Sequence, residues 1–169
     1  MLRHRLQQTS DTPELQLRQR QETARAYGSL GSVAKKRGDL VSARHFFEED
    51  LKVRKQWIAA EPTNLNARTQ YAGALSKMSD MALSLADYSA AQEHARDSLV
   101  ELREVARQKP GSRTFQYNVA IKAGWSGYLC TATGRSKDAV PYYSEALDIL
   151  TALHNQDPDN APIRPKLGA

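Results

Sequence analysis

Residues 24–62 read ARAYGSLGSVAKKRGDLVSARHFFEEDLKVRKQWIAAEP, and four positions within this segment recur twice more along the chain at a spacing of 48 residues. Self-similarity at such a spacing is typical of stacked helical repeats, because each repeat buries its apolar face against the next one. The sequence therefore predicts an all-α solenoid of three antiparallel helical hairpins. The four recurring columns are Ala24, Ala72 and Ala120; Ala43, Ala91 and Ala139; Leu51, Leu99 and Leu147; and Pro62, Pro110 and Pro158.

The proline column separates the predicted repeats. A proline blocks the continuation of a helix. Thr63 or Asn64 after the first proline, and Ser112 after the second, are natural N-caps for the next helix. We therefore expect repeats at 14–62, 63–110 and 111–158.

The two ends of the chain are predicted to be tails. In residues 1–13, Leu2 and Arg5 precede Pro13 much as Leu51 and Arg54 precede Pro62, which suggests that this segment closes an earlier repeat. In residues 159–169, two further prolines disfavour a long helix.

Each predicted repeat is interrupted near its midpoint. Gly38 lies at the break of the first repeat and Gly134 at that of the third, as suits the left-handed residue that ends many helices. The second repeat has Ala86 there. Its turn is expected either to differ from the other two or to cost about 1 kcal/mol for a left-handed alanine.

Small residues occupy matched positions on both helices of each predicted hairpin. Such residues allow two helix backbones to approach closely, and larger ones would overpack the contact. We therefore expect these surfaces to meet within each hairpin. The predicted packing residues are Gly31, Ser79 and Gly127 on the first helices, and Ala43, Ala91 and Ala139 on the second.

The segment Tyr27-x2-Leu30-Gly31-x2-Ala34, followed by Ala43-x3-Phe47, resembles the tetratricopeptide (TPR) repeat, whose pattern is W-x2-L-G-x2-Y, then A-x3-F, then P. The family's repeats are about 34 residues long. An excess of about 14 residues is almost four helical turns, so each helix gains about two turns without changing the faces it presents. The chain thus resembles a long-helix TPR variant, and HEAT-type repeats of about 40–47 residues are the alternative.

The resemblance implies a partner-binding groove lined by the first helices of the repeats. Trp125 and Tyr128 of the third repeat could instead pack between repeats, and we favour this interpretation over contact with a partner. Lys35 alone is of the type found in the family's two-carboxylate clamp, so the binding of chaperone tails is not supported. The candidate groove residues are Arg25, Ser32, Lys35, Ser76, Asp80, Leu83, Ile121, Trp125 and Tyr128.

No catalytic, metal or cofactor motif is found in the sequence. The four histidines occupy unrelated repeat positions, and none lies in an H-E-x-x-H pattern. Cys130 shares its column with Ala34 and Ala82, which favours a small buried thiol. Glu48, Glu49 and Asp50 are interpreted as a run on the surface. The sequence therefore predicts a protein that is not an enzyme and that binds no cofactor.

The net charge of +5 comes from residues 1–56, which hold 12 basic and 7 acidic residues. No block of five like charges occurs there, so a solvated helix surface is favoured over a nucleic-acid site. No apolar stretch reaches the ~18–20 residues that span a bilayer, and the start lacks the apolar core of a secretory signal. The single cysteine is consistent with a reducing compartment, so a cytoplasmic protein without a membrane partner is expected.

These observations favour a non-catalytic module that binds a protein or peptide, with self-association through the repeat ends as a further expectation. Two alternatives stay open. The chain could be the regulatory C-terminal repeat region of a larger signalling enzyme, such as a bacterial serine/threonine protein kinase. It could instead bind nucleic acid through the basic first repeat.

Overall fold

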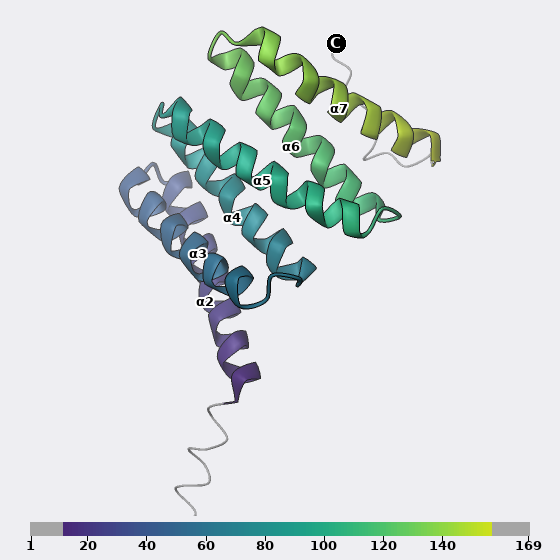
Figure 1. Ribbon diagram of the computed structural model, residues 1–169. Helices are drawn as coiled ribbons and strands as arrows, with labels where there is room; N and C mark the ends of the chain where they lie inside the picture. Colours follow the sequence, from purple (N-terminus) through teal and green to yellow (C-terminus); the bar gives the residue numbers. More distant parts are fainter. Residues whose placement is uncertain (1–11, 157–169) are drawn as a thin grey trace, which may run out of the picture. The chain divides into compact units, whose positions relative to one another are not determined.

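The computed structural model describes residues 12–156, and every regular element within that range is an α-helix (Figure 1). The prediction of an all-α solenoid is confirmed. The predicted tails and Pro158 lie outside the described residues, apart from Thr12 and Pro13 at the start of the first helix. The helices are α2 (Pro13–Lys36), α3 (Leu40–Ala60), α4 (Leu65–Ser84), α5 (Tyr88–Gln108), α6 (Arg113–Ala132) and α7 (Ser136–Gln156).

The loops that contain Pro62 and Pro110 separate α3 from α4 and α5 from α6. The side-chain oxygen of Asn64 accepts hydrogen bonds from the backbone N–H groups of Asn66 and Ala67 at 2.9 and 3.1 Å. These bonds satisfy donors that have no partner inside the first turn of a helix. Asn64 therefore caps the start of α4, and Ser112 is the N-cap of α6.

The turns at the midpoints of the three hairpins share one backbone conformation. Gly38, Ala86 and Gly134 have φ angles of +80°, +58° and +74°. In each turn the next backbone N–H bonds back to a carbonyl of the preceding helix, for example from Asp87 N to Ala82 O at 2.9 Å. The second turn therefore keeps the geometry of the other two and places an alanine in the left-handed region.

Replacing Ala86 with glycine is expected to stabilise the protein by about 0.5–1 kcal/mol. Glycine has no Cβ to clash in the left-handed region, and this gain exceeds its greater loss of chain entropy. Urea unfolding of the parent and of Ala86→Gly measures the difference. Gly134→Ala, at the matching turn, should lose a similar amount, and a less stable Ala86→Gly would contradict the turn geometry.

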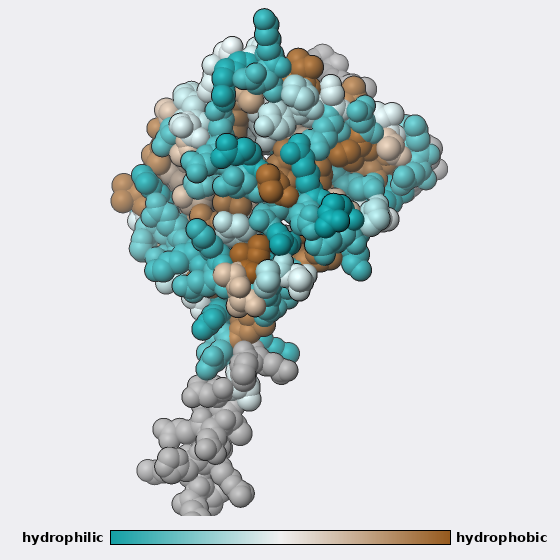
Figure 2. Space-filling view, in the orientation of Figure 1, coloured by the Kyte–Doolittle hydropathy of each residue, from teal (hydrophilic) through white to brown (hydrophobic). Residues whose placement is uncertain are grey.

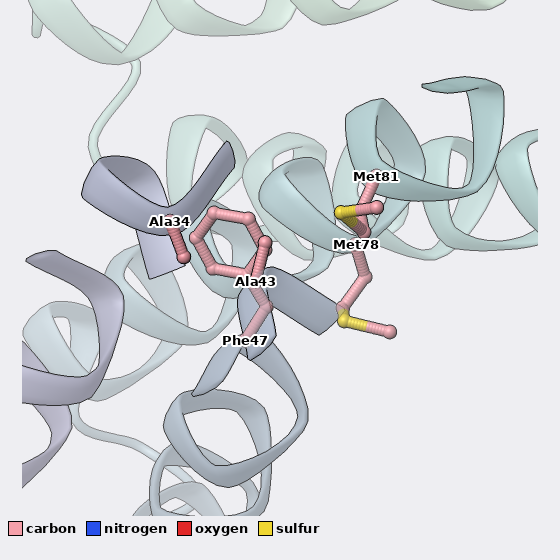
Figure 3. Close-up of a cluster of buried hydrophobic side chains, with 5 residues drawn as sticks. All are labelled: Ala34, Ala43, Phe47, Met78 and Met81. Atoms are coloured by element: carbon pink, nitrogen blue, oxygen red, sulfur yellow. The ribbon is translucent and has the colours of Figure 1, made fainter. Parts of the chain in front are cut away.

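The chain divides into two compact units, one up to Met81 and the other from Ala82 onward, so the boundary lies inside α4. In the first unit, Ala34 of α2, Ala43 and Phe47 of α3, and Met78 and Met81 of α4 form a buried cluster (Figure 3). This cluster joins three helices into one core. In the second unit the corresponding cluster is formed by Ala82, Ala91, Ala95 and Leu129.

The predicted packing glycines lie beneath aromatic rings. A Cβ built on Gly31 would lie 2.6 Å from two ring carbons of Phe47, and one on Gly127 would lie 2.9 Å from a ring carbon of Tyr143. Contacts this short require the ring or the helix to move. The other four predicted packing residues, Ser79, Ala43, Ala91 and Ala139, are buried.

Candidate functional site

Three candidate groove residues lie on one face of α6. Ile121, Trp125 and Tyr128 are four and three residues apart, a spacing that aligns side chains along a helix. Ile121 is 44% and Tyr128 49% exposed. The rings of Trp125 and Tyr128 are stacked, with centroids 5.3 Å apart and planes at 26°. This face, which we call the α6 face, presents an aromatic pair beside an aliphatic residue.

A shallow pocket of ≈ 440 Å³ lies on the α6 face and is lined by these residues together with Lys122 and Gly124. A Cβ at Gly124 would meet no atom within 4 Å, so the glycine leaves open space. On the side of the molecule shown in Figure 2 the described surface is mostly hydrophilic, and hydrophobic residues form separate patches. The depression on the α6 face is lined by aromatic and aliphatic groups, so an apolar side chain can dock on it.

The three apolar groove candidates other than Ile121 differ in their surroundings. Leu83 and Trp125 are partly buried and pack against the core cluster of the second unit, whereas Tyr128 is half exposed. Trp125 therefore packs on the core with part of its ring and on Tyr128 with another part. The packing interpretation of the aromatic pair therefore fits part of Trp125 but not Tyr128.

The groove candidates of the first unit are polar and engaged with neighbours. The ammonium of Lys35 on α2 forms an ion pair with the carboxylate of Asp80 on α4. The hydroxyl of Ser32 donates to the carbonyl of Gly28 at 2.8 Å, and Arg25 is paired with Glu22 at 3.1 Å. Ser76, the remaining candidate, is half-buried. The structure thus brings Lys35 and Asp80 together.

Further basic side chains of the first repeat also lie beside acidic ones. Arg44 lies 2.8 Å from Glu48, and Lys52 lies 3.5 Å from Glu49. These pairs neutralise part of the local positive charge, which weakens the attraction to a polyanion on which nucleic-acid binding depends.

A buried ionic cluster in the first unit was not predicted. Asp50 is fully buried, which corrects the interpretation of Glu48, Glu49 and Asp50 as a surface run. Its two carboxylate oxygens accept hydrogen bonds from Arg54 Nε at 2.5 Å and from Lys77 Nζ at 2.9 Å. A buried carboxylate requires such partners, because an unpaired charge away from water is costly.

The rest of the cluster completes the enclosure of Asp50. Arg54, itself buried, donates from a terminal nitrogen to the amide oxygen of Gln70 at 2.8 Å. A Cβ on Gly28 would lie 2.6 Å from a carboxylate oxygen of Asp50, so this glycine makes room for the group. One signal in the sequence could have indicated that Asp50 and Arg54 are buried. Their spacing places them on the same stripe of α3 as the buried residues Ala43, Phe47 and Trp57.

A larger pocket of ≈ 700 Å³ in the second unit was also not predicted. It is bounded by α5, α6 and α7, so it is lined by both kinds of helix and not by first helices alone. Two of its polar side chains bond to neighbouring residues: Arg103 pairs with Glu145 at 2.6 Å, and the Gln92 amide donates to Leu129 O at 3.1 Å and to Thr133 Oγ1 at 2.8 Å. Hydrogen bonding to Glu145 raises the pKa of Arg103. The lining residues are Ser89, Gln92, Glu93, Ala95, Arg96, Arg103, Ser126, Leu129, Cys130, Arg135, Asp138, Pro141 and Tyr142.

Reactive groups are dispersed within residues 12–156. In this range no group of three or more His, Cys, Asp or Glu side chains is placed to hold a metal ion. Cys130 is a buried free thiol. His94 is half-buried, and its Nδ1 atom is buried. No helix of the described range has the length and apolar character needed to cross a membrane.

Comparisons with protein families, curated proteins and solved structures found matches among the solved structures. No protein-family model matches the chain. No curated protein matches it. Among solved structures, the chain is similar to the crystal structure of MamA protein, with 13% sequence identity and a TM-score of 0.21. The match covers 80% of this chain and 96% of the MamA chain.

Proposed function

We propose that this chain is a non-catalytic protein-interaction module that binds a helix or peptide of a partner protein on the α6 face. The observation that carries the proposal is the exposure of Ile121 and Tyr128 around the pocket on α6. The partner is expected to insert an apolar or aromatic side chain beside Tyr128. This function agrees with the resemblance to TPR proteins noted in the sequence.

Physical chemistry favours this face as a binding site over the polar residues of the first unit. Water is displaced favourably from aromatic and aliphatic surface, and tyrosine and tryptophan are enriched among the residues that dominate binding energy at interfaces. Tyr128 is held by its stacking on Trp125, which is in turn anchored to the core. The loss of side-chain freedom on binding is therefore small, since part of it is already lost in the unbound protein.

Photo-crosslinking followed by binding measurements tests the proposal. A photoreactive amino acid at position 128 is expected to crosslink a discrete partner in the native host, whereas the same group at Val41, which is 84% exposed on α3, should not. With that partner purified, Tyr128→Ser and Ile121→Ser should each weaken binding by roughly tenfold or more, as expected for a residue at the centre of an interface. Val41→Ser is the matched control.

Equal crosslinking from positions 128 and 41 would contradict the assignment of the α6 face. Unchanged affinity in both Tyr128→Ser and Ile121→Ser would do the same. Both positions are about half exposed, so the substitutions leave the core intact, and circular dichroism should show unchanged helix content.

A further inference from the structure

The first helix described exposes apolar residues at positions that are buried in the later repeats. Leu30 and Val33 of α2 are each 48% exposed. One period later, Met78 and Met81 of α4 are buried, and two periods later Ser126 and Leu129 of α6 are buried as well. We call Leu30 and Val33 the α2 stripe.

The last helix described shows the complementary pattern. Tyr143 and Leu147 of α7 are 43% and 52% exposed. One period earlier, Ala95 and Leu99 of α5 are buried. With Val140, which is 61% exposed, Tyr143 and Leu147 form a line along the helix that we call the α7 stripe.

Inside the chain these two sets of positions pack against each other. In the first unit, Phe47 of α3 lies in one buried cluster with Met78 and Met81 of α4 (Figure 3). Leu51 of α3 packs against that cluster. In the second unit, Ala91 and Ala95 of α5 lie in one cluster with Leu129 of α6. The second helix of a hairpin thus covers the first helix of the next hairpin through the same columns in both units.

The α7 stripe is more apolar than the surface used at the junction between α5 and α6. There, Gln92 donates hydrogen bonds to the Leu129 carbonyl and the Thr133 hydroxyl. The matching position in α7 is Val140. On the α2 side, the position that matches Leu129 is Val33. A contact between the two stripes would therefore bring valine against valine at this point, where the internal junction has a polar bond.

We propose that this protein associates head to tail with further copies of itself, the α7 stripe of one copy packing on the α2 stripe of the next. The contact continues the packing seen from α3 to α4 and from α5 to α6 across a boundary between chains. It removes exposed valine, leucine and tyrosine surface from water on both partners. It shares no residue with the α6 face and stands independently of the proposed function.

The two stripes differ, so the contact is heterologous. Each assembled pair retains one free α2 stripe and one free α7 stripe, and growth continues until a ring closes. The average mass is therefore expected to rise continuously with concentration, without a plateau at the dimer.

Sedimentation velocity over a wide concentration range tests the association, with one charge placed in each stripe. Val33→Glu and Leu147→Glu are each expected to lower the association constant by roughly 100-fold or more, because each would bury a carboxylate against apolar surface. Val41→Glu, which lies outside both stripes, should assemble like the parent. Leu30→Lys and Val140→Lys repeat the test at independent positions, and circular dichroism confirms that each variant is folded.

Mixing the two glutamate variants tests the polarity of the contact. Val33→Glu retains an intact α7 stripe and Leu147→Glu an intact α2 stripe, so an equimolar mixture is expected to form a 1:1 dimer and nothing larger. A dimer that persists in Val33→Glu alone and is lost in Leu147→Glu would show a symmetric contact between α7 helices and would overturn the proposal.

A strictly monomeric parent at every concentration would also overturn the proposal. If the parent is monomeric, deletion of residues 157–169 tests whether this segment occupies the α7 stripe of its own chain. Assembly of the shortened chain would show that it does. Tyr128→Ser should assemble normally, so loss of partner binding and loss of self-association can be told apart.

Discussion

Asp50→Ala is expected to lower the free energy of unfolding by about 3–5 kcal/mol, the range found when one partner of a buried ion pair is removed. The substitution leaves the buried guanidinium of Arg54 without its carboxylate, and Gln70 is its only other partner that the structure records. Lys77, whose side chain is 37% exposed, can turn toward water. Most of the loss should therefore come from Arg54.

A double substitution that copies the second repeat separates charge from packing. One period after Asp50 and Arg54 the chain has Ser98 and Leu102, both buried in α5. Asp50→Ser combined with Arg54→Leu removes both buried charges at once, and this variant is expected to be more stable than Asp50→Ala by about 2 kcal/mol or more. If the double variant were the less stable of the two, the buried-charge explanation would fail.

The two tryptophans allow the loss to be assigned to one unit. Trp57 lies buried in α3 of the first unit, and Trp125 belongs to the second. Urea unfolding followed by Trp57 fluorescence in a Trp125→Phe background should show the full effect of Asp50→Ala. Fluorescence of Trp125 in a Trp57→Phe background should show a smaller shift if the units unfold separately, and an equal shift if they unfold together.

Gly31→Ala is expected to destabilise the protein by about 1–3 kcal/mol, the usual cost of overpacking. The new Cβ would lie 2.6 Å from the Phe47 ring, which is itself held in the buried cluster of the first unit. The clash must exceed the stabilisation of about 1 kcal/mol that alanine brings to a helix interior. Thermal or urea unfolding measures the difference.

Gly73→Ala is the matched control, since it is the same substitution inside α4. A Cβ at Gly73 would meet no atom within 4 Å, so this variant should be more stable than the parent by up to about 1 kcal/mol. The two substitutions are thus predicted to have opposite signs. A stable Gly31→Ala would show that α2 and α3 do not approach as closely at Phe47 as the structure indicates.

The repeat architecture could be predicted from the sequence because it depends on backbone restrictions that recur. Pro62 and Pro110 cannot continue a helix, and Gly38 and Gly134 adopt the left-handed turn that the sequence indicated. Ala86 shows the limit of this reasoning. The sequence left open whether this turn differs from the other two or places alanine in the left-handed region, and Ala86 adopts the left-handed conformation.

The ionic cluster could not be predicted from the repeat pattern, because it occurs in only one copy. The column of Asp50 continues as Ser98 and Ala146, and that of Lys77 continues as Trp125, so the comparison of repeats gives no sign of a charge pair. Asp50 and Lys77 lie 27 residues apart in the sequence and on different helices. The large pocket of the second unit escaped prediction for a similar reason, since its lining comes from three helices, α5, α6 and α7.

The salt bridge from Asp50 to Lys77 also limits how this array can change in length. If a copy of the third repeat were inserted after Glu61, the copy of Trp125 would take the place that Lys77 has now. The carboxylate of Asp50 would then lose its ion pair with the Lys77 ammonium. The junction between α5 and α6 has Ser98 in the corresponding column and no buried carboxylate there. Duplication of a unit is therefore better tolerated after Lys109 than after Glu61, so the two junctions are not interchangeable in evolution or in engineering.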